Sequence, residues 1–480
     1  MTDIDHVARR AAEAHREFAR TAPRVRARAL TAIADALAAD DRLVPTAMDE
    51  TGLSEARLTG ELKRTTFQLK EFADTVLDGG YLDVRIDSPV ADYPIGPRPD
   101  VRRYLAPVGP VLNFAASNFP LAFSVLGGDT AAALAAGCSV VVKAHPGHPA
   151  LSDLTAELAR AALDEAGISR DTLQLVHGQD EAVELLKHPL IRAASFTGSV
   201  RAGRVLANIA AGRPDPIPFF GELGSVNPVV VTASALADRG DELITGYVGS
   251  VSGSAGQLCT KPGFLFVPDG EQLDESLRSA AAEVTEHRLL NPQITDGYRQ
   301  RRQTILDSGV RLVSEGSVRV DESGNGWVTP TLVAVSLEEL IAKADLLRDE
   351  AFGPLSIVVE YPDGTDLAAT LDDLFQGNLT ATVQLGPDDA ADPVVAELVH
   401  HLSERVGRVL FAGWPTGVSV TPAMQHGGPW PATTNDSGTS VGSAAISRFL
   451  RPVAYQSAPQ QLLPPPLRDD NPWGVPQQRH

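Results

Sequence analysis

Cysteine is nearly absent from this 480-residue sequence, which contains only Cys138 and Cys259. Two cysteines this far apart cannot form the disulfide framework of a small secreted domain. A free cysteine is most often a small buried hydrophobic residue, but it can also act as a nucleophile. Cys259 stands in GSAGQLCT, a run of small residues in which the backbone can approach a ligand closely. The local sequence leaves both interpretations open.

Basic residues and long apolar runs are also scarce. There are 41 Lys and Arg against 61 Asp and Glu, which gives a net charge of −20. Such a surface repels phosphate backbones and anionic lipids, so neither nucleic acid nor a membrane is expected as a partner. The longest apolar run, 131–142, is mostly alanine and is shorter than the roughly 20 residues that span a bilayer. The first 20 residues lack the apolar core of a signal peptide, and we expect a cytoplasmic protein.

The hydrophobic pattern predicts an α/β protein. In the first 75 residues or so, apolar residues such as Leu30, Ile33 and Leu37 share a helical face. The period then changes to two, which predicts strands over 81–87 and near 101–105. From residue 108, short apolar strands alternate with helices, which is typical of a parallel sheet covered on both faces. The expected strands are 108–115, 138–144, 173–178 and 193–198, with helices over 120–137 and from about 151 to 162.

A second α/β region is predicted from about 224 to 440. Its apolar strands are expected at 227–233, 262–268, 355–361 and 408–414. A last strand at 449–456 and a Pro-rich tail at 457–480 belong to neither core by their pattern. A terminal strand followed by an extended arm often lies on a neighbouring subunit, and we expect this arrangement here.

Several polar residues follow the predicted strands, but each has an ordinary interpretation. The glycines of 196–203 could leave backbone N–H groups free for a phosphate, or they could form a plain turn. Lys143 could bind a ligand at the carboxyl end of its strand or be a solvated terminus. Asn118 could donate an amide hydrogen bond into the crevice or form a turn before proline. Glu222 could have a buried role or be a loop glutamate.

Metal and hydrolase chemistry are less well supported. His145 and His148 are three residues apart, but a proline lies between them and no further ligand is nearby in the sequence. We therefore expect ordinary loop or surface histidines and no metal site. A cysteine hydrolase needs a base histidine beside the sulfur, and none of the 11 histidines has a flanking sequence that suggests this role.

The motifs taken together are far more specific than any one of them. In order and approximate spacing, the sequence resembles the aldehyde dehydrogenase superfamily over essentially the whole chain. Within it, the chain is similar to the branch of α-ketoglutaric semialdehyde (2,5-dioxopentanoate) dehydrogenases, with SNFPLAFSVLGGDTAAALAAGC, KAHPGHP and an ending PTGVSVTPAMQHGGPWPATT. The motifs that carry the wider resemblance are ASNFP, VVVKAHPGHP, FTGS, GELGSVNP, GQLCT and DEAFGP.

The resemblance implies roles for individual residues. Cys259 matches the catalytic nucleophile, Glu222 the general base for the hydrolytic water, and Asn118 the amide that holds the oxyanion. Cofactor-binding residues are also implied: Lys143 matches the lysine that contacts the adenosine ribose, and Ser199 a residue beside the pyrophosphate. Glu350 and Phe352 match the pair that positions the nicotinamide ribose and ring. Cys138 then remains as a structural cysteine.

The substrate end of the site is implied less directly. Phe119, in ASNFP, is expected to line it. Trp414 stands where the family usually has phenylalanine at the mouth of the aldehyde tunnel, and Lys261 stands where asparagine is common in this branch. A cation at residue 261 could help to bind an acidic substrate or lower the pKa of the thiol. Relatives that pass the acyl group to coenzyme A generally lack the glutamate that Glu222 matches, so an acylating enzyme or a catalytically silent relative is the lesser alternative.

The resemblance also implies a domain arrangement. We expect an aldehyde dehydrogenase-like α/β fold with a Rossmann-type parallel-sheet cofactor domain (1–80 and 106–222) and an α/β catalytic domain (223–440). A small β oligomerisation module, formed by 81–105 and 441–480, should join a homodimer or homotetramer. NADP is the expected cofactor, with NAD also possible, because Pro146 replaces the glutamate that commonly binds the adenosine ribose in NAD-preferring relatives.

Overall fold

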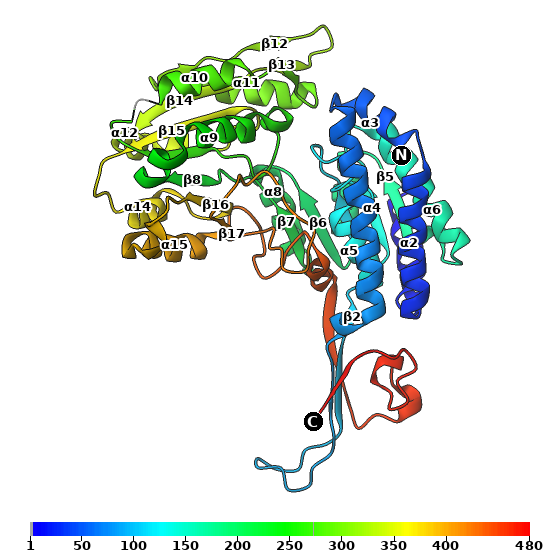
Figure 1. Cartoon of the computed structure of the whole chain (residues 1–480). Helices are drawn as coiled ribbons and strands as arrows, with labels where there is room; N and C mark the ends of the chain where they lie inside the picture. The colour runs from blue at the N-terminus through cyan, green and yellow to red at the C-terminus, as the bar shows by residue number, and fades with distance from the viewer. Residues whose placement is uncertain (1–2, 272) are drawn as a thin grey trace.

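The structure is a computed structural model that describes residues 3–271 and 273–480. Met1 and Thr2 fall in the predicted cofactor domain and residue 272 in the predicted catalytic domain, and these three lie outside the described residues. Two α/β lobes lie side by side, and a slender β module projects from between them (Figure 1). The α/β fold class predicted from the sequence is confirmed.

The first lobe is built on a parallel five-stranded sheet of order β5-β4-β3-β6-β7. Its strands are apolar and buried on both faces, as a covered parallel sheet requires. Helices α2, α4, α5 and α6 cover one face, and α1, α7 and α8 cover the other. The elements are α1 (Ile4–Phe18), α2 (Pro23–Ala39), α3 (Leu43–Thr51), α4 (Glu55–Asp78), β3 (Val111–Phe114), α5 (Gly128–Ala136), β4 (Val140–Lys143), α6 (Pro149–Glu165), β5 (Leu173–Val176), α7 (Gln179–Lys187), β6 (Ala193–Thr197), α8 (Val200–Ala211) and β7 (Phe219–Glu222).

The helix predicted over 120–137 is wrong in its first half. Residues 120–127 form turns, and α5 begins only at Gly128. The backbone N–H groups of Leu121 and Ala122 donate to the Glu61 carboxylate of α4, each at 2.8 Å. At Gly127, a Cβ atom would collide with the carbonyl of Ala122, so the chain doubles back too closely for a helix. A tertiary contact therefore overrides the apolar local pattern.

The second lobe is built on a seven-stranded sheet of order β11-β14-β15-β9-β8-β16-β17, in which only β11 is antiparallel to its neighbour. A small sheet of order β10-β13-β12 lies beside it. The elements are β8 (Pro228–Val231), α9 (Ala233–Ser252), β9 (Phe264–Pro268), α10 (Asp274–Ala282), β10 (His287–Arg288), α11 (Pro292–Leu306), β11 (Arg311–Ser314), β12 (Val318–Val320), β13 (Gly326–Val328), β14 (Thr331–Ser336), α12 (Leu337–Ala342), α13 (Ala344–Leu347), β15 (Leu355–Tyr361), α14 (Leu367–Leu374), β16 (Asn378–Gln384), α15 (Pro393–Arg405) and β17 (Val406–Leu410).

The projecting module is a four-stranded sheet of order β18-β2-β1-β19. Its strands are β1 (Val84–Asp87), β2 (Val101–Pro107), β18 (Leu450–Gln456) and β19 (Gln477–Arg479). The Pro-rich tail returns along its own chain, where β19 pairs in parallel with β1. Its expected contact with a neighbouring subunit stays a prediction. Apolar side chains from the tail and from the 81–87 segment form a small separate core, because proline-rich chain can still bury leucine and valine against a sheet.

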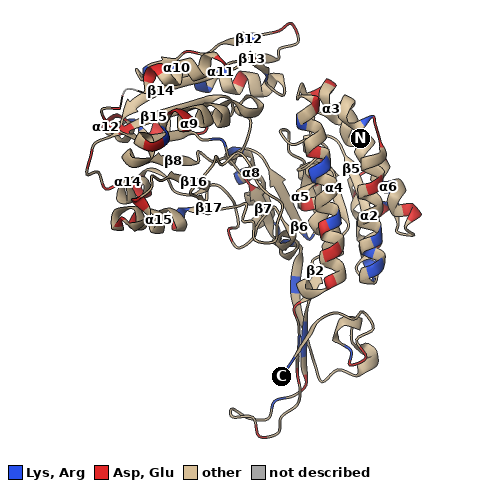
Figure 2. Ribbon diagram, in the orientation of Figure 1, with Lys and Arg blue, Asp and Glu red and all other residues tan. Residues whose placement is uncertain are grey.

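Charged side chains gather on the outer helices, whereas the strands of the two large sheets carry few of them (Figure 2). Most of the acidic and basic residues are therefore kept out of the two sheets, with exceptions such as Lys143 at the end of β4 and Glu222 at the end of β7. Among the described residues, no helix is long and apolar enough to cross a membrane.

Candidate active site

Four of the residues singled out from the sequence lie at the carboxyl edge of the five-stranded sheet. Asn118 follows β3, Lys143 ends β4, Ser199 follows β6 and Glu222 ends β7. Because parallel strands end at the same edge, residues far apart in the sequence are brought to one crevice. The sheet starts at β3 and is extended first on one side and then on the other, so this crevice lies where the strand order reverses.

Three more of the singled-out residues lie at the amino edge of the seven-stranded sheet. Cys259 precedes β9, and Glu350 and Phe352 precede the neighbouring strand β15. The two edges meet, because the Asn118 side-chain amide Nδ2 donates to the Gln257 carbonyl at 3.0 Å. The structure therefore brings the predicted oxyanion donor to the loop that carries the predicted nucleophile.

The cysteine loop has an unusual backbone that explains its small residues. Ser254 and Ala255 have φ values of 50° and 54°, and Gly256 has a φ of 66°. A Cβ atom at Gly256 would collide with the backbone of Gly353, so only glycine lets the two loops approach each other. The loop is also fixed from below by Asn227, whose Nδ2 donates to the carbonyl of Cys259 at 2.8 Å.

Helix α4 contributes residues that the sequence analysis missed. Arg57 donates to the Ser254 hydroxyl at 3.2 Å and to the Asn118 carbonyl at 3.3 Å. It also pairs at 2.5 Å with Glu61, whose side chain is buried. Arg57, Glu61 and Arg64 are spaced i, i+4 and i+7, so a charged stripe on an otherwise apolar helical face could have indicated them.

The thiol of Cys259 lies beside a histidine that the sequence did not identify. The Sγ atom is 3.6 Å from Nε2 of His426, which is buried. Burial, together with the charges of Glu222 and Glu350, raises the pKa of the Cys259 thiol to about 12, while Arg64 acts in the opposite direction. Burial and nearby arginines lower the pKa of His426 to about 3, so its ring is neutral at physiological pH.

Two arginines lie close enough to Cys259 to interact with its charge. Arg64 acts to lower the pKa of the Cys259 thiol. Burial lowers the pKa of Arg408, and the charge of Cys259 acts to raise it. Arg64 donates through one nitrogen to the Val418 carbonyl at 2.7 Å, while its Nε and Nη2 are buried without a hydrogen-bond partner among the described residues. Its guanidinium lies 5.5 Å from the ring centre of Phe123. Buried donors without partners are costly, and a bound anion would satisfy them.

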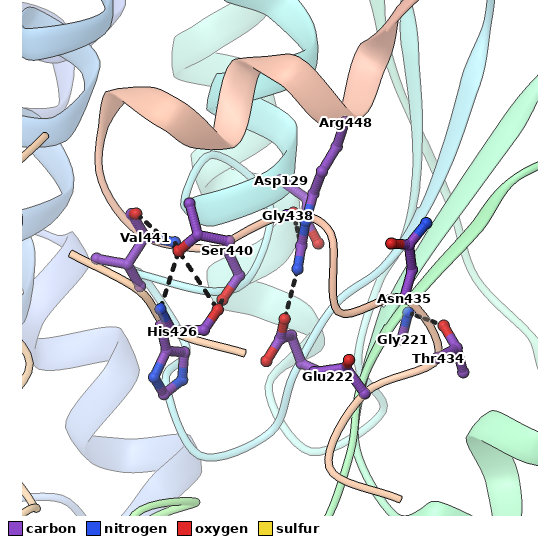
Figure 3. A network of polar contacts seen from close by, with 12 residues as sticks. Asp129, Gly221, Glu222, His426, Thr434, Asn435, Gly438, Ser440, Val441 and Arg448 are labelled. Atoms are coloured by element: carbon purple, nitrogen blue, oxygen red, sulfur yellow. Dashed lines mark hydrogen bonds and ion pairs between the residues drawn. The ribbon is translucent and has the colours of Figure 1, made fainter. Parts of the chain in front are cut away.

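Glu222 is buried and held by an ion pair. Its Oε1 accepts a hydrogen bond of 2.5 Å from Arg448, which also contacts Asp129 at 3.1 Å (Figure 3). Burial raises the pKa of Glu222 to about 7, even though Arg448 acts in the opposite direction. A carboxyl group with this pKa can exist as a base near neutral pH.

Lys261 does not occupy the place expected from the sequence. Its ammonium group donates to the Leu355 carbonyl at 2.6 Å and faces Glu350 rather than the thiol. It is not among the main influences on the pKa of Cys259, so the expectation that it assists the thiol finds no support. The chain turns at Cys259, where the Lys261 N–H donates to the Leu258 carbonyl at 3.0 Å, and the Lys261 side chain is therefore directed toward Glu350.

The two aromatic residues expected at the substrate end lie apart. Phe119 packs edge-to-face on Phe123, with ring centres 5.3 Å apart, and Arg57 lies over its ring. Trp414 lies against α9, 5.9 Å from the ring of Tyr247. Its indole occupies the space that a side chain at Gly246 would need.

The predicted cofactor residues differ in how the protein holds them. The Lys143 side chain is buried, its ammonium group makes no hydrogen bond with another described residue, and burial lowers the pKa of that group. The Ser199 hydroxyl accepts from the Ala202 N–H at 3.3 Å and so caps α8. Pro146 is exposed, and Arg204 is turned onto the ring of Trp430.

The remaining sulfur and imidazole groups have structural partners. Cys138 is buried, and its Sγ lies 3.6 Å from the Phe449 carbonyl. His148 is buried rather than at the surface, with Nε2 at 2.9 Å from the Ala116 carbonyl, and His145 stacks on it. Within residues 3–271 and 273–480, no group of three or more His, Cys, Asp or Glu side chains is arranged to hold a metal ion.

Comparisons with known proteins identify the family of the chain. An α-ketoglutaric semialdehyde dehydrogenase of Acinetobacter baylyi is 41% identical over 480 residues, covering 99% of this chain and 90% of the relative. α-Ketoglutaric semialdehyde dehydrogenase 2 of Azospirillum brasilense is 42% identical, covering 100% and 91%. The structure of an NAD-dependent aldehyde dehydrogenase from Sinorhizobium meliloti has the same fold, with a TM-score of 0.77 at 23% identity, covering 95% and 88%. The model of the aldehyde dehydrogenase family matches residues 1–428, and the chain therefore belongs to this family of NAD(P)-dependent oxidoreductases.

Proposed function

We propose that the protein oxidises α-ketoglutaric semialdehyde to 2-oxoglutarate with NADP or NAD as the hydride acceptor. The names of the two relatives that are more than 40% identical support this substrate. The proposal is carried by a buried cluster in which the Cys259 thiol feels the charges of Glu222 and Arg64, and in which the Arg64 guanidinium has donors without a partner among the described residues. These groups match an aldehyde that also carries a carboxylate.

Cys259 attacks the aldehyde carbon as the thiolate and forms a thiohemiacetal. The oxygen becomes an alkoxide, which needs donors that are already in position. Asn118 supplies one through its side-chain amide, and the backbone N–H of Cys259 supplies the other. In the free protein the Asn118 amide is held by the Gln257 carbonyl, which keeps it beside the cysteine loop.

The residues at the sheet edge fit a dinucleotide. The buried Lys143 ammonium has no hydrogen-bond partner in the described part of the chain and can bind the adenosine ribose. Ser199 stands at the start of α8, where backbone N–H groups favour a pyrophosphate. Glu350 would hold the nicotinamide ribose beside Phe352, and its carboxyl group interacts with the charge of Lys261. The bound cofactor supplies the acceptor for the hydride that leaves the thiohemiacetal carbon.

Glu222 then acts in hydrolysis of the thioester. It removes a proton from water as the water oxygen attacks the thioester carbon, and the sulfur leaves as thiolate. A pKa of about 7 suits this step, because the carboxylate is both available and basic enough at neutral pH. The presence of this base favours hydrolysis over transfer of the acyl group to coenzyme A.

Arg64 would bind the carboxylate at the far end of the substrate, with Arg408 nearby. The Nε and Nη2 atoms of Arg64 form the fork that pairs with a carboxylate, and both lack a partner among the described residues. Phe123 lies against the same guanidinium and limits the space around it. An acidic aldehyde would therefore be favoured over a neutral one of the same length.

The proposal extends to the organisation of the chain. We assign 1–80 and 106–222 to cofactor binding, 223–440 to the catalytic domain, and 81–105 with 441–480 to a module that joins a homodimer or homotetramer. Within the last range, residues 443–449 pack in the core of the first lobe and bring Arg448 to Glu222, so the module itself begins after them. A reduced Cys259 requires a reducing compartment, so the cytoplasm is the proposed location.

The test compares an acidic and a neutral aldehyde of similar length in wild type and in Arg64→Met. Arg64→Met should lower kcat/KM for α-ketoglutaric semialdehyde about 10- to 100-fold, because hydrogen bonds to a charged group are lost. For the neutral aldehyde, kcat/KM should fall several-fold less than for the acidic one, because this substrate loses only the effect of Arg64 on the pKa of the Cys259 thiol. Arg9→Met, at an exposed arginine of α1 remote from the crevice, is the matched control and should change neither value.

Cys259→Ala should abolish the reduction of the cofactor with both aldehydes while the protein remains folded. Wild-type turnover in that variant would overturn the assignment of the nucleophile. Equal losses for both aldehydes in Arg64→Met would overturn the assignment of the substrate carboxylate but not that of the enzyme class.

A further inference from the structure

We propose that Arg448 is a positioning residue for Glu222, and that Asp129 balances the charge of Arg448 so that Glu222 remains a base. The inference rests on the role proposed above for Glu222 in hydrolysis of the thioester. Three residues from separate parts of the chain form this group: Asp129 in the first turn of α5, Glu222 at the end of β7, and Arg448 in η5 (Ser443–Phe449).

The geometry leaves one oxygen of Glu222 fixed and the other available. Arg448 donates to Oε1 of Glu222 at 2.5 Å through Nη2 and to Oδ1 of Asp129 at 3.1 Å through Nη1 (Figure 3). Oε2 of Glu222 is buried and has no hydrogen-bond partner among the described residues. The ion pair therefore orients the carboxylate by one oxygen, and the second oxygen is left to take a proton from water.

The group is isolated from solvent, which makes its charges act strongly on one another. The side chains of Arg448, Glu222 and Asp129 are 2%, 4% and 6% exposed. The guanidinium also lies over the ring of Phe220, 5.6 Å from its centre. Charges in such an environment are weakly screened, and removing one of them changes the proton affinity of its neighbours.

The Arg448 guanidinium lies between the carboxylates of Glu222 and Asp129, and this arrangement sets the proton affinity of the three-residue group. With both carboxylates ionised the group carries one net negative charge, and one added proton makes it neutral. If Arg448 faced Glu222 alone, the ion pair would make Glu222 a weak base. Asp129 competes for the same guanidinium and raises the pKa of Glu222, in addition to the larger effect of burial. Asp129 thus adds to the effect of burial in keeping Glu222 basic against the ion pair with Arg448.

Other charged groups around Glu222 are few. The Ser440 hydroxyl and the Cys259 thiol face it, and the neutral His426 ring lies nearby. Strand β6, which pairs with β7, has no titratable side chain in Ala193–Thr197. Helix α8 carries Arg201 and Arg204, and both are exposed. The response of Glu222 to pH is therefore assigned mainly to Arg448 and Asp129.

The step affected is the second half-reaction. The water oxygen forms a bond to the thioester carbon while a proton passes to Oε2 of Glu222. The carbon–sulfur bond then breaks, its electron pair returns to the sulfur of Cys259, and the carboxylic acid is released. No oxidant or reductant takes part, because the hydride has already left in the first half-reaction.

The test is the pH dependence of hydrolysis in Asp129→Asn and Arg448→Gln, measured as the steady rate after the first burst of reduced cofactor. The half-maximal pH of the acidic limb should fall by about one unit in Asp129→Asn, because Arg448 then acts on Glu222 alone. It should rise by about one unit in Arg448→Gln, because the stabilising cation is lost. The burst rate should stay within about twofold of wild type in both variants.

Shifts of the same sign, or no shift in Asp129→Asn, would overturn the inference. If Arg448→Gln does not fold, Arg448→Lys is the second variant. Lysine keeps the positive charge but cannot donate to Glu222 and Asp129 through two nitrogens of one planar group. This variant should therefore slow hydrolysis about tenfold, with little shift in the half-maximal pH of the acidic limb. A lower rate of hydrolysis with an almost unchanged pH profile would not arise if Arg448 had only a structural role.

Glu222→Gln separates this inference from the function on which it rests. If this variant hydrolyses the thioester at the wild-type rate, Glu222 is not the base and the proposed role of that residue fails. If Glu222→Gln is slow but the acidic limb of Asp129→Asn matches wild type, only the inference about Arg448 and Asp129 fails.

Discussion

At the scale of single residues, His426 shows what proximity in sequence cannot reveal. It stands 167 positions after Cys259, yet its Nε2 lies 3.6 Å from the sulfur. Its ring is neutral, since burial lowers its pKa to about 3, so it cannot offer a positive charge to the thiolate. A neutral ring can still donate one N–H to a thiolate, which stabilises the charged form. We therefore assign it a role in holding the sulfur.

His426→Leu should react with iodoacetamide roughly tenfold more slowly than wild type at a fixed pH, because one hydrogen bond to the thiolate is lost. His426→Gln retains a side-chain donor and should recover part of the rate. Alkylation is the measurement, and Cys259→Ala gives the background from Cys138. An unchanged rate in His426→Leu would show that the short distance has no effect on the thiol.

At the scale of elements, the C-terminal tail forms part of its own β module. Leu467 is fully buried in the core that the tail shares with β1, whereas Leu462 is 74% exposed. Arg102 holds the tail by donating to the Leu467 carbonyl and to Asp469, each at 2.8 Å. The tail covers the β1 edge, and an uncovered edge is a site for pairing with another chain.

Removal of 457–480 should therefore produce species larger than the full-length protein forms, detected by light scattering coupled to size-exclusion chromatography. Leu467→Ser should lower the free energy of unfolding of the module by about 2–4 kcal/mol, because a buried leucine is lost. The matched variant Leu462→Ser should be neutral. An unchanged size distribution after truncation would mean that the tail does not protect the edge.

At the scale of the whole molecule, the cofactor would lie between the two lobes. Lys143 and Ser199 come from the first lobe, and Glu350 and Phe352 come from the second. The pocket for the adenosine end contains no carboxylate at residue 146, which removes a repulsion against a 2′-phosphate. Arg204 of α8 lies over the ring of Trp430, and Lys143 is the proposed cation at this end.

We expect kcat/KM with NADP to equal or exceed that with NAD, measured with one aldehyde at saturation. Pro146→Glu should shift the ratio toward NAD by about tenfold, equivalent to about 1.4 kcal/mol. Arg204→Ala should leave the ratio unchanged and serves as the control. A tenfold preference for NAD in the wild-type protein would contradict the role given to Pro146.

Local patterns in the sequence were sufficient for most of the architecture. Apolar runs such as those at 138–144 and 262–268 became β4 and β9, because a covered parallel strand must be apolar on both faces. The pattern failed where a distant group intervened. Residues 120–127 are apolar and predict a helix, but Glu61 takes two of their backbone N–H groups.

The sequence by itself determined the family, the α/β fold and the candidate nucleophile, because these depend on motifs and on periodicity within short segments. Only the tertiary structure decided which charges face one another. It turned Lys261 toward Glu350, placed His426 beside Cys259 and joined Arg448 to Glu222. The physical reason is that electrostatic interactions in a buried site depend on distances of a few ångströms between side chains from different elements, and the order of residues along the chain does not set those distances.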